Sequence, residues 1–122
     1  MNAPTLIPLH NRLEDLFSYI REGRILDAIN EFYSEDTVMQ ENSLPATVGR
    51  KANLEREKQF LSTVKDWQRF DVLAKGVGEN VTFYETVMDW VTTDGTPVHA
   101  EQVVVAKWRN GKIIHERYYH NS

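Results

Sequence analysis

The sequence contains no cysteine among its 122 residues. Disulfides, thiolate metal sites and cysteine nucleophiles are therefore excluded. The absence fits a reducing compartment, and we expect a cytoplasmic protein. The first ten residues, MNAPTLIPLH, contain no basic stretch and no long apolar run, so we expect no signal peptide. No window approaches the ~18 apolar residues of a transmembrane helix, so no membrane association is expected.

The chain also lacks an excess of basic residues. Its formal net charge is -4, and its 14 lysines and arginines are scattered, often beside acidic residues. Nucleic-acid-binding proteins usually carry a clustered basic face, so we expect no nucleic-acid partner. The sequence has no Gly-rich phosphate loop, no dinucleotide fingerprint and no Ser-His-Asp order. Its histidines have no partners at metal-ligand spacing. We therefore expect neither a metal nor a cofactor.

The composition of the chain is that of an ordinary globular domain. A chain of this length with 41% hydrophobic and 26% charged residues is expected to form one domain, 1–122. The first half predicts helices, because apolar residues recur at three- and four-residue steps over 13–20, 25–32 and about 51–64. A short strand is expected from Thr37 to Glu41.

The second half predicts strands. Residues 67–77 and 80–93 are rich in β-branched and aromatic side chains. Asp94-Gly95 and Asn110-Gly111 are typical hairpin turns. Together the patterns predict an α+β fold, in which three N-terminal helices pack on one face of a mostly antiparallel sheet.

The two turns sort the strand residues into faces. The Asn110-Gly111 turn pairs Val104 with Arg117, and an even-length loop around Asp94-Gly95 pairs Glu85 with Val104. Residues opposite each other in an antiparallel pair point to the same face. If the loop around Asp94-Gly95 had an odd length instead, the two faces of strand 80–93 would be exchanged. The first face collects Phe83, Glu85, Val87, Asp89, Ala100, Gln102, Val104, Ala106, Trp108, Ile113, His115, Arg117 and Tyr119. The second face collects Tyr84, Thr86, Met88, Trp90, His99, Glu101, Val103, Val105, Lys107, Ile114, Glu116, Tyr118 and His120.

Both faces are only half apolar, and two explanations fit this mixture. The first face is interpreted as a core that contains a polar pocket. The second is interpreted as a partner surface, because a large exposed apolar patch usually marks an interface. We therefore expect a homodimer through the outer sheet face. The expected contact residues are Tyr84, Met88, Trp90, Val103, Val105 and Tyr118.

Three short segments carry a resemblance to a known family. They are the run Tyr33-Ser34-Glu35-Asp36, Gly49 ahead of the third helix, and the turn Asn110-Gly111-Lys112-Ile113 before the last strand. With these segments the chain resembles the SnoaL-like branch of the nuclear transport factor 2-like superfamily, the polyketide cyclase and ketosteroid isomerase type of fold, over about residues 11–119. The resemblance implies a strongly curved, cone-like sheet around a pocket that the helices close. The family includes isomerases, cyclases, dehydratases, hydrolases and members without known activity.

The resemblance implies one catalytic candidate, Glu41. In the ketosteroid isomerase branch, the proton-shuttling carboxylate lies five residues after the Asp that ends the aromatic-x-acid-Asp run. Here that Asp is Asp36, which gives Glu41. An apolar cavity can raise the pKa of such a carboxylate into a useful range. The alternative is a solvated side chain at a strand end. The remainder of that branch's site is not matched, because Tyr19 in the first helix is out of step and Val103-Val104-Val105 stands where a late acid is needed.

The first sheet face suggests a second catalytic candidate, His115, as a general acid or base. Arg117 would anchor a carboxylate or enolate oxygen, or it would form a structural ion pair with Glu85. Gln102 and Tyr119 would orient the ligand. The expected ligand-binding residues are Tyr19, Phe60, Trp67, Glu85, Gln102, Arg117 and Tyr119. These residues predict a pocket for a small, largely apolar molecule with a polar or carbonyl end, and cofactor-independent acid–base chemistry on it. The alternative is a non-catalytic module that binds a small ligand or a protein.

Overall fold

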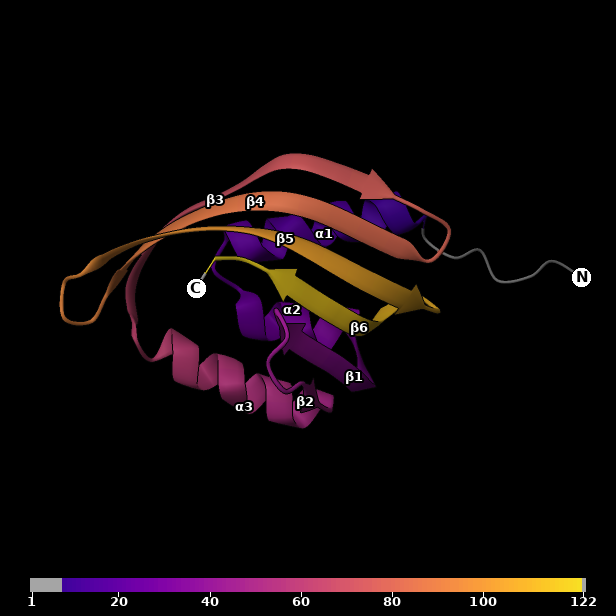
Figure 1. Cartoon of the computed structure of the whole chain (residues 1–122), viewed down its shortest axis with the longest axis horizontal. Coiled ribbons are helices and arrows are strands. Elements are labelled where there is room, and N and C mark those ends of the chain that lie inside the picture. The colour runs from indigo at the N-terminus through magenta and orange to yellow at the C-terminus, as the bar shows by residue number, and fades with distance from the viewer. Residues whose placement is uncertain (1–7, 122) are drawn as a thin grey trace, which may run out of the picture.

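The computed structural model describes residues 8–121; residues 1–7 and 122, the two ends of the expected domain, lie outside the described residues. The elements, in chain order, are α1 (Leu9–Arg21), α2 (Ile25–Phe32), β1 (Tyr33–Glu41), β2 (Thr47–Val48), α3 (Arg50–Leu61), β3 (Val64–Val77), β4 (Val81–Thr92), β5 (Pro97–Arg109) and β6 (Lys112–Tyr119) (Figure 1). Within residues 8–121, no helix has the length and apolar character needed to cross a membrane.

Helices α1 and α2 form where the apolar periodicity predicts them, and they supply six of the fourteen buried residues of the core cluster. The buried positions follow the three- and four-residue spacing of one helix face. A turn at Gly23, whose φ of 75° suits glycine, separates the two helices. The side chains that α1 and α2 bury are Leu13, Leu16, Phe17, Ala28, Ile29 and Phe32.

Helix α3 begins after Gly49, whose φ is 97°, and ends at Leu61. The expected helix over about 51–64 is too long at its end, because Val64 already pairs with Thr92 in the sheet. Asn53 fixes the start of the helix, since its buried Nδ2 donates to the carbonyls of Thr47 and Gly49 at 3.1 and 2.8 Å.

The six strands form one sheet in the order β2-β1-β6-β5-β4-β3. Strands β1 and β6 are parallel, and every other neighbouring pair is antiparallel. The expected α+β class, with helices on a mostly antiparallel sheet, is confirmed. The expected strong curvature is wrong: the strands β3, β4 and β5 arch over α1, but the sheet is not strongly curled (Figure 1). It stays open because β2 and β3 are edge strands that do not meet.

The hairpin turn Asn110-Gly111 is confirmed, but the register beyond it differs from the prediction. Both turn residues have positive φ, 52° and 76°, as a tight two-residue hairpin turn requires. Trp108 pairs with Ile113 as expected. The next pair is Lys107 with His115, so Ile114 is an extra residue, a β-bulge, in β6. Because the side-chain period of a strand is two, the bulge places every later side chain of β6 on the face opposite to the predicted one.

The loop between β4 and β5 also differs from the prediction. The last pair before it is Val91 with Pro97, so the loop spans the five residues 92–96 and has an odd length. Glu85 therefore lies opposite Val103, and the predicted pairing of Glu85 with Val104 is wrong. Compared with the prediction, the two faces of β4 are exchanged, as an odd-length loop requires.

The two register changes redefine the faces of the sheet. The inner face, which packs on the helices, carries Thr82, Tyr84, Thr86, Gln102, Val104, Ala106, Ile113, Glu116 and Tyr118. Of the side chains expected to form a dimer contact, Tyr84, Met88, Trp90 and Tyr118 belong to this inner face. Val103 and Val105 face outward, where Phe83 and Val103 are 44% and 40% exposed. The homodimer itself stays a prediction.

A candidate active site between the sheet and the helices

A cavity of about 570 Å³ lies between the inner face of the sheet and the three helices. This volume is in the range that small-molecule sites occupy, roughly 300–1,000 Å³. Aliphatic side chains of α1 and α2, such as Leu16 and Ile29, form part of the wall, and Met88 and Ala100 of the sheet form another. The polar groups of the cavity include a tyrosine cluster and a second group on the side that α3 forms, and Gln102, His120 and Asn121 also line the cavity.

The tyrosine cluster surrounds Glu116, a carboxyl group that is only 1% exposed. The Tyr33 hydroxyl donates to Glu116 Oε1 at 2.5 Å, and the Tyr118 hydroxyl donates to the same oxygen. The other oxygen, Oε2, is buried without a hydrogen-bond partner in residues 8–121. Burial raises the pKa of Glu116 from 4.5 to about 7, although the hydrogen bonds from Tyr118 and Tyr33 lower it. Glu116 can therefore hold or release a proton near neutral pH.

Tyr33 and Tyr118 line the cavity, and Glu116 lies behind them. Tyr84 lines the cavity beside them, and its hydroxyl makes no hydrogen bond with the described part of the chain. Burial raises the pKa of all three phenols well above the usual value, and the Glu116 charge adds to this effect. The hydroxyls therefore keep their protons at neutral pH and act as hydrogen-bond donors, those of Tyr33 and Tyr118 to Glu116.

The second polar group lies on the side of the cavity that α3 forms. Arg56 Nη2 contacts Glu41 Oε2 at 2.6 Å, and both side chains are about 40% exposed, at 41% and 38%. Glu57, the next residue of α3, also lines the cavity. Its pKa is raised by burial and by the charge of Glu41, against the opposite effect of Arg56.

Three aromatic rings form another part of the cavity wall. Phe60 lies edge-on to Trp90, with ring centroids 5.4 Å apart, and Trp90 stacks on Trp67 at 5.8 Å. The Trp67 indole is held in place because its Nε1 donates to the Ile20 carbonyl at 3.1 Å. All three rings line the cavity.

The structure brings four of the residues predicted from the sequence to this cavity. They are Glu41, Phe60, Trp67 and Gln102. Tyr19 is elsewhere, because its ring packs edge-on against Phe32 at 5.2 Å and does not line the cavity.

The remaining predicted site residues lie on the outer face of the sheet. His115, Arg117 and Tyr119 follow the Ile114 bulge and are turned away from the cavity, and Glu85 is exposed on β4. Arg117 Nε donates to the Asn42 carbonyl at 2.9 Å, and its guanidinium lies over the Tyr119 ring. The predicted pairing of Arg117 with Glu85 inside the pocket is therefore wrong.

The sequence interpretation missed Glu116, Tyr33 and Glu57, and it assigned Tyr84 and Tyr118 to a partner surface. A signal for strand β4 was present: Glu85 and Asp89 alternate with Tyr84, Thr86 and Met88, and two acids on one side indicate the solvent face. For β6 the sequence contains no comparable signal, because a bulge at Ile114 leaves both possible faces half polar.

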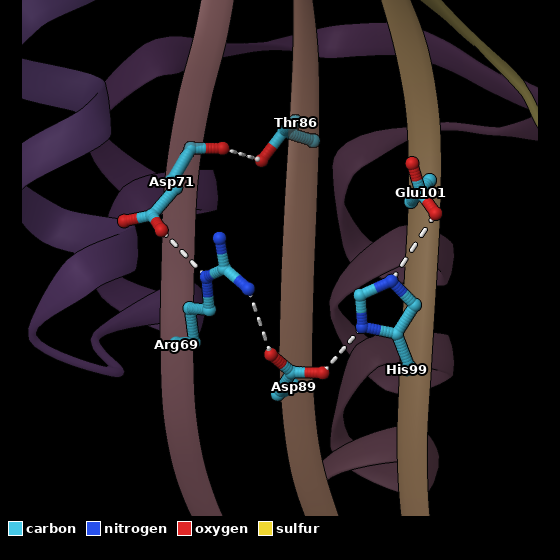
Figure 2. A network of polar contacts seen from close by, with 6 residues as sticks. All are labelled: Arg69, Asp71, Thr86, Asp89, His99 and Glu101. Carbon is cyan, nitrogen blue, oxygen red and sulfur yellow. Dashed lines mark hydrogen bonds and ion pairs between the residues drawn. The ribbon is translucent and has the colours of Figure 1, made fainter.

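The outer face carries a polar network of its own (Figure 2). Asp89 contacts Arg69 at 3.5 Å and His99 at 2.6 Å, and His99 also contacts Glu101 at 3.2 Å. The hydrogen bond that His99 makes to the Asp89 carboxylate is the largest of the effects that raise the pKa of His99. These side chains are partly or largely exposed, and Arg69 also pairs with Asp71. Within the described residues, no group of three or more acidic, histidine or cysteine side chains is arranged to hold a metal ion.

Comparison with solved structures identifies the fold. A "putative SnoaL-like polyketide cyclase" from Mesorhizobium loti is 17% identical, with a TM-score of 0.80, over 93% of this chain and 100% of that one. An NTF2-like protein of unknown function from Burkholderia pseudomallei is 8% identical, with a TM-score of 0.80, over 93% and 90% of the two chains. A "putative isomerase" from Rhodopseudomonas palustris is 12% identical, with a TM-score of 0.77, over 97% and 93%.

These comparisons show that the chain has the NTF2-like fold of SnoaL-like proteins, as the resemblance in the sequence implied. No family model matches the sequence, and no curated protein matches it. At such low identity the structural likeness concerns the fold and not the activity.

Proposed function

We propose that the protein binds a small, largely apolar molecule with a carbonyl-type oxygen and catalyses cofactor-independent proton transfer on it. Such a step begins many isomerisations, cyclisations and dehydrations. The observation that supports this proposal is the buried Glu116 carboxyl behind Tyr33 and Tyr118 at the cavity wall. A carboxyl group with a pKa near the working pH is what general acid–base catalysis needs.

The protonation state of Glu116 would control the two tyrosines. When Glu116 is ionised, both hydroxyls donate to its Oε1 and offer only lone pairs to the cavity. When Glu116 is protonated, it can donate to a phenol oxygen, and the freed hydroxyl can turn to a ligand oxygen. A donor aimed at the oxygen of an enolate stabilises the charge that develops there. Tyr84, whose hydroxyl makes no hydrogen bond with residues 8–121, would add a further donor.

Glu41 is the proposed acceptor of the carbon-bound proton. It lines the cavity on the side of α3, where Arg56 contacts one of its oxygens and leaves the other for a substrate. Gln102, on the inner face of β5, would orient the polar end of the molecule. His115 and Arg117 have no part in this proposal, because both face away from the cavity.

The experiment is deuterium exchange at the carbon beside the carbonyl of small neutral ketones, such as 4-phenyl-2-butanone and cyclohexanone, followed by NMR in heavy water. Wild type is expected to bind the ketones and to accelerate exchange. Glu116→Gln and Tyr118→Phe are expected to slow exchange by roughly 100-fold or more, the usual contribution of one acid–base group. Tyr119→Phe is the matched control, because Tyr119 is the next residue but faces outward.

Absence of binding for every ketone would overturn the proposal. Equal slowing in Tyr118→Phe and Tyr119→Phe would remove the tyrosine cluster from the mechanism. Binding without exchange would favour a second candidate function, a non-catalytic small-molecule carrier. One observation supports that candidate: Glu116 does not itself line the cavity, and Glu41 is paired with Arg56.

A further inference from the structure

The charges around the cavity are unbalanced. Glu41 and Glu57 line it, and Glu116 lies directly behind its tyrosines. Arg56 is the one lysine or arginine among the described lining residues, and it is bonded to Glu41. The side chains of His99 and Glu101, which also border the cavity, pair with each other on the outer face. His120 is a further basic side chain of the lining, but the acids Glu41, Glu57 and Glu116 still outnumber Arg56 and His120.

Glu57 is the acidic group best placed to meet a ligand. It forms no ion pair and no hydrogen bond with residues 8–121, although it is only partly exposed. An acid in such a position is costly unless a cation or a hydrogen-bond donor compensates for it. Burial and, to a smaller extent, the charge of Glu41 raise the pKa of Glu57, and the charge of Arg56, which is bonded to Glu41, only partly offsets this. A positively charged ligand would provide that partner.

The surroundings of Glu57 are also suited to a cation. Phe60 lies three residues after Glu57 on α3, so the two side chains share one helix face. The Phe60 ring contacts Trp90, and Trp90 stacks on Trp67. Aromatic faces attract ammonium groups, tryptophan most strongly. A carboxyl group beside an aromatic wall is thus a combination that favours organic cations.

We propose that the ligand carries a protonated amine on an apolar body, with the nitrogen held between Glu57 and the aromatic wall of Phe60, Trp90 and Trp67. The proposal deepens the proposed function and rests on its small-molecule cavity. The apolar body would lie against Leu16 and Met88, and an oxygen at its other end would meet the tyrosine cluster. Molecules with a carboxylate in place of the amine are excluded by the same acidic groups.

The test compares matched amines, alcohols and carboxylates on three bodies, phenylpropyl, cyclohexylpropyl and naphthylmethyl. Binding is measured by NMR titration with the wild type, Glu57→Gln and Glu55→Gln. The control residue Glu55 is an exposed acid on the same helix that does not line the cavity. The amine of at least one body is expected to bind roughly tenfold more tightly than its alcohol, and the carboxylate least tightly. This preference is expected to disappear in Glu57→Gln and to persist in Glu55→Gln.

Alcohols that bind as well as the amines, or better, would overturn the inference and leave the proposed cavity function standing. An amine preference that persists in Glu57→Gln would show that Glu57 is not the partner, which also overturns the inference. If amines, alcohols and ketones all fail to bind, the proposed function fails, and the inference fails with it. Since the neutral alcohols and ketones report on the cavity alone, the two failures are distinguishable.

Discussion

The buried Glu116 predicts how the stability of the protein changes with pH. Its pKa is about 7 in the folded protein and 4.5 in the ordinary, unfolded state. Between these values the folded protein keeps a proton that the unfolded chain has released. Raising the pH through this window therefore lowers the free energy of unfolding. The loss is complete once the pH exceeds the folded pKa.

The magnitude follows from the two pKa values. They differ by roughly 2.5, and each pH unit is worth ~1.4 kcal/mol, so the loss is roughly 3 kcal/mol. Glu116→Gln keeps the shape of the side chain and cannot ionise. Its amide nitrogen would have no acceptor at the position of Oε2, which costs about 1–3 kcal/mol at every pH. The difference in stability between the two proteins should therefore move by roughly 3 kcal/mol in favour of the variant between about pH 4 and about pH 8.

The assay is urea unfolding of wild type and Glu116→Gln at several pH values, followed by tryptophan fluorescence. Glu57 and the exposed groups titrate in both proteins, so their contributions largely cancel in the difference. Glu85→Gln is the control, because Glu85 is exposed on the outer face, and its stability should follow that of wild type. Parallel pH profiles for wild type and Glu116→Gln would refute the reasoning, since Glu116 would then titrate alike in both states.

Four further predictions concern other parts of the molecule. Leu13 is fully buried in α1, so Leu13→Ala should lower the free energy of unfolding by about 2–5 kcal/mol in urea titrations, and a loss below ~1 kcal/mol would contradict the packing. NMR titration should find the pKa of His99 above the usual value, because Asp89 contacts it, and Asp89→Asn should lower that pKa. In the same titration the pKa of His115 should lie below the usual value, because burial and the nearby cations Lys107 and Arg117 disfavour its charged form. If the expected homodimer forms through the outer face, wild type should sediment as a dimer and Val103→Glu as a monomer, whereas a monomeric wild type would exclude this interface.

The helices could be predicted from the sequence because their signal is redundant. In α1 and α2 the buried positions repeat over several turns, and a change at one position would not obscure the period. The class of fold follows from the order of these helices and the strands after them. The end of α3 could not be located in the same way, since its one fully buried residue, Asn53, is polar.

The faces of β4 and β6 depend on single residues. The alternating acids Glu85 and Asp89 indicated the face of β4, which was nevertheless assigned wrongly, whereas the face of β6 could not be predicted. An odd number of residues in the loop 92–96 and one extra residue, Ile114, were enough to exchange the faces of these strands. The candidate site depends on those faces, so Gln102 on β5 was found and Glu116 on β6 was not, whereas Glu41 was found through the family resemblance. Glu57 was missed for a different reason, because it lies in the charged run Glu55-Arg56-Glu57-Lys58, and charged side chains usually face water.

The bulge at Ile114 decides which alternate side chains of β6 reach the interior. Residues before it point as the two-residue period predicts, and residues after it point to the opposite face. Without the bulge, His115 and Arg117 would point into the interior; with it, Glu116 and Tyr118 do. Insertion or loss of one residue in this strand would thus replace a basic interior by an acidic one, or the reverse, without any substitution. Site residues can therefore be assigned from one protein of this fold to another only after any bulges in their last strands have been aligned.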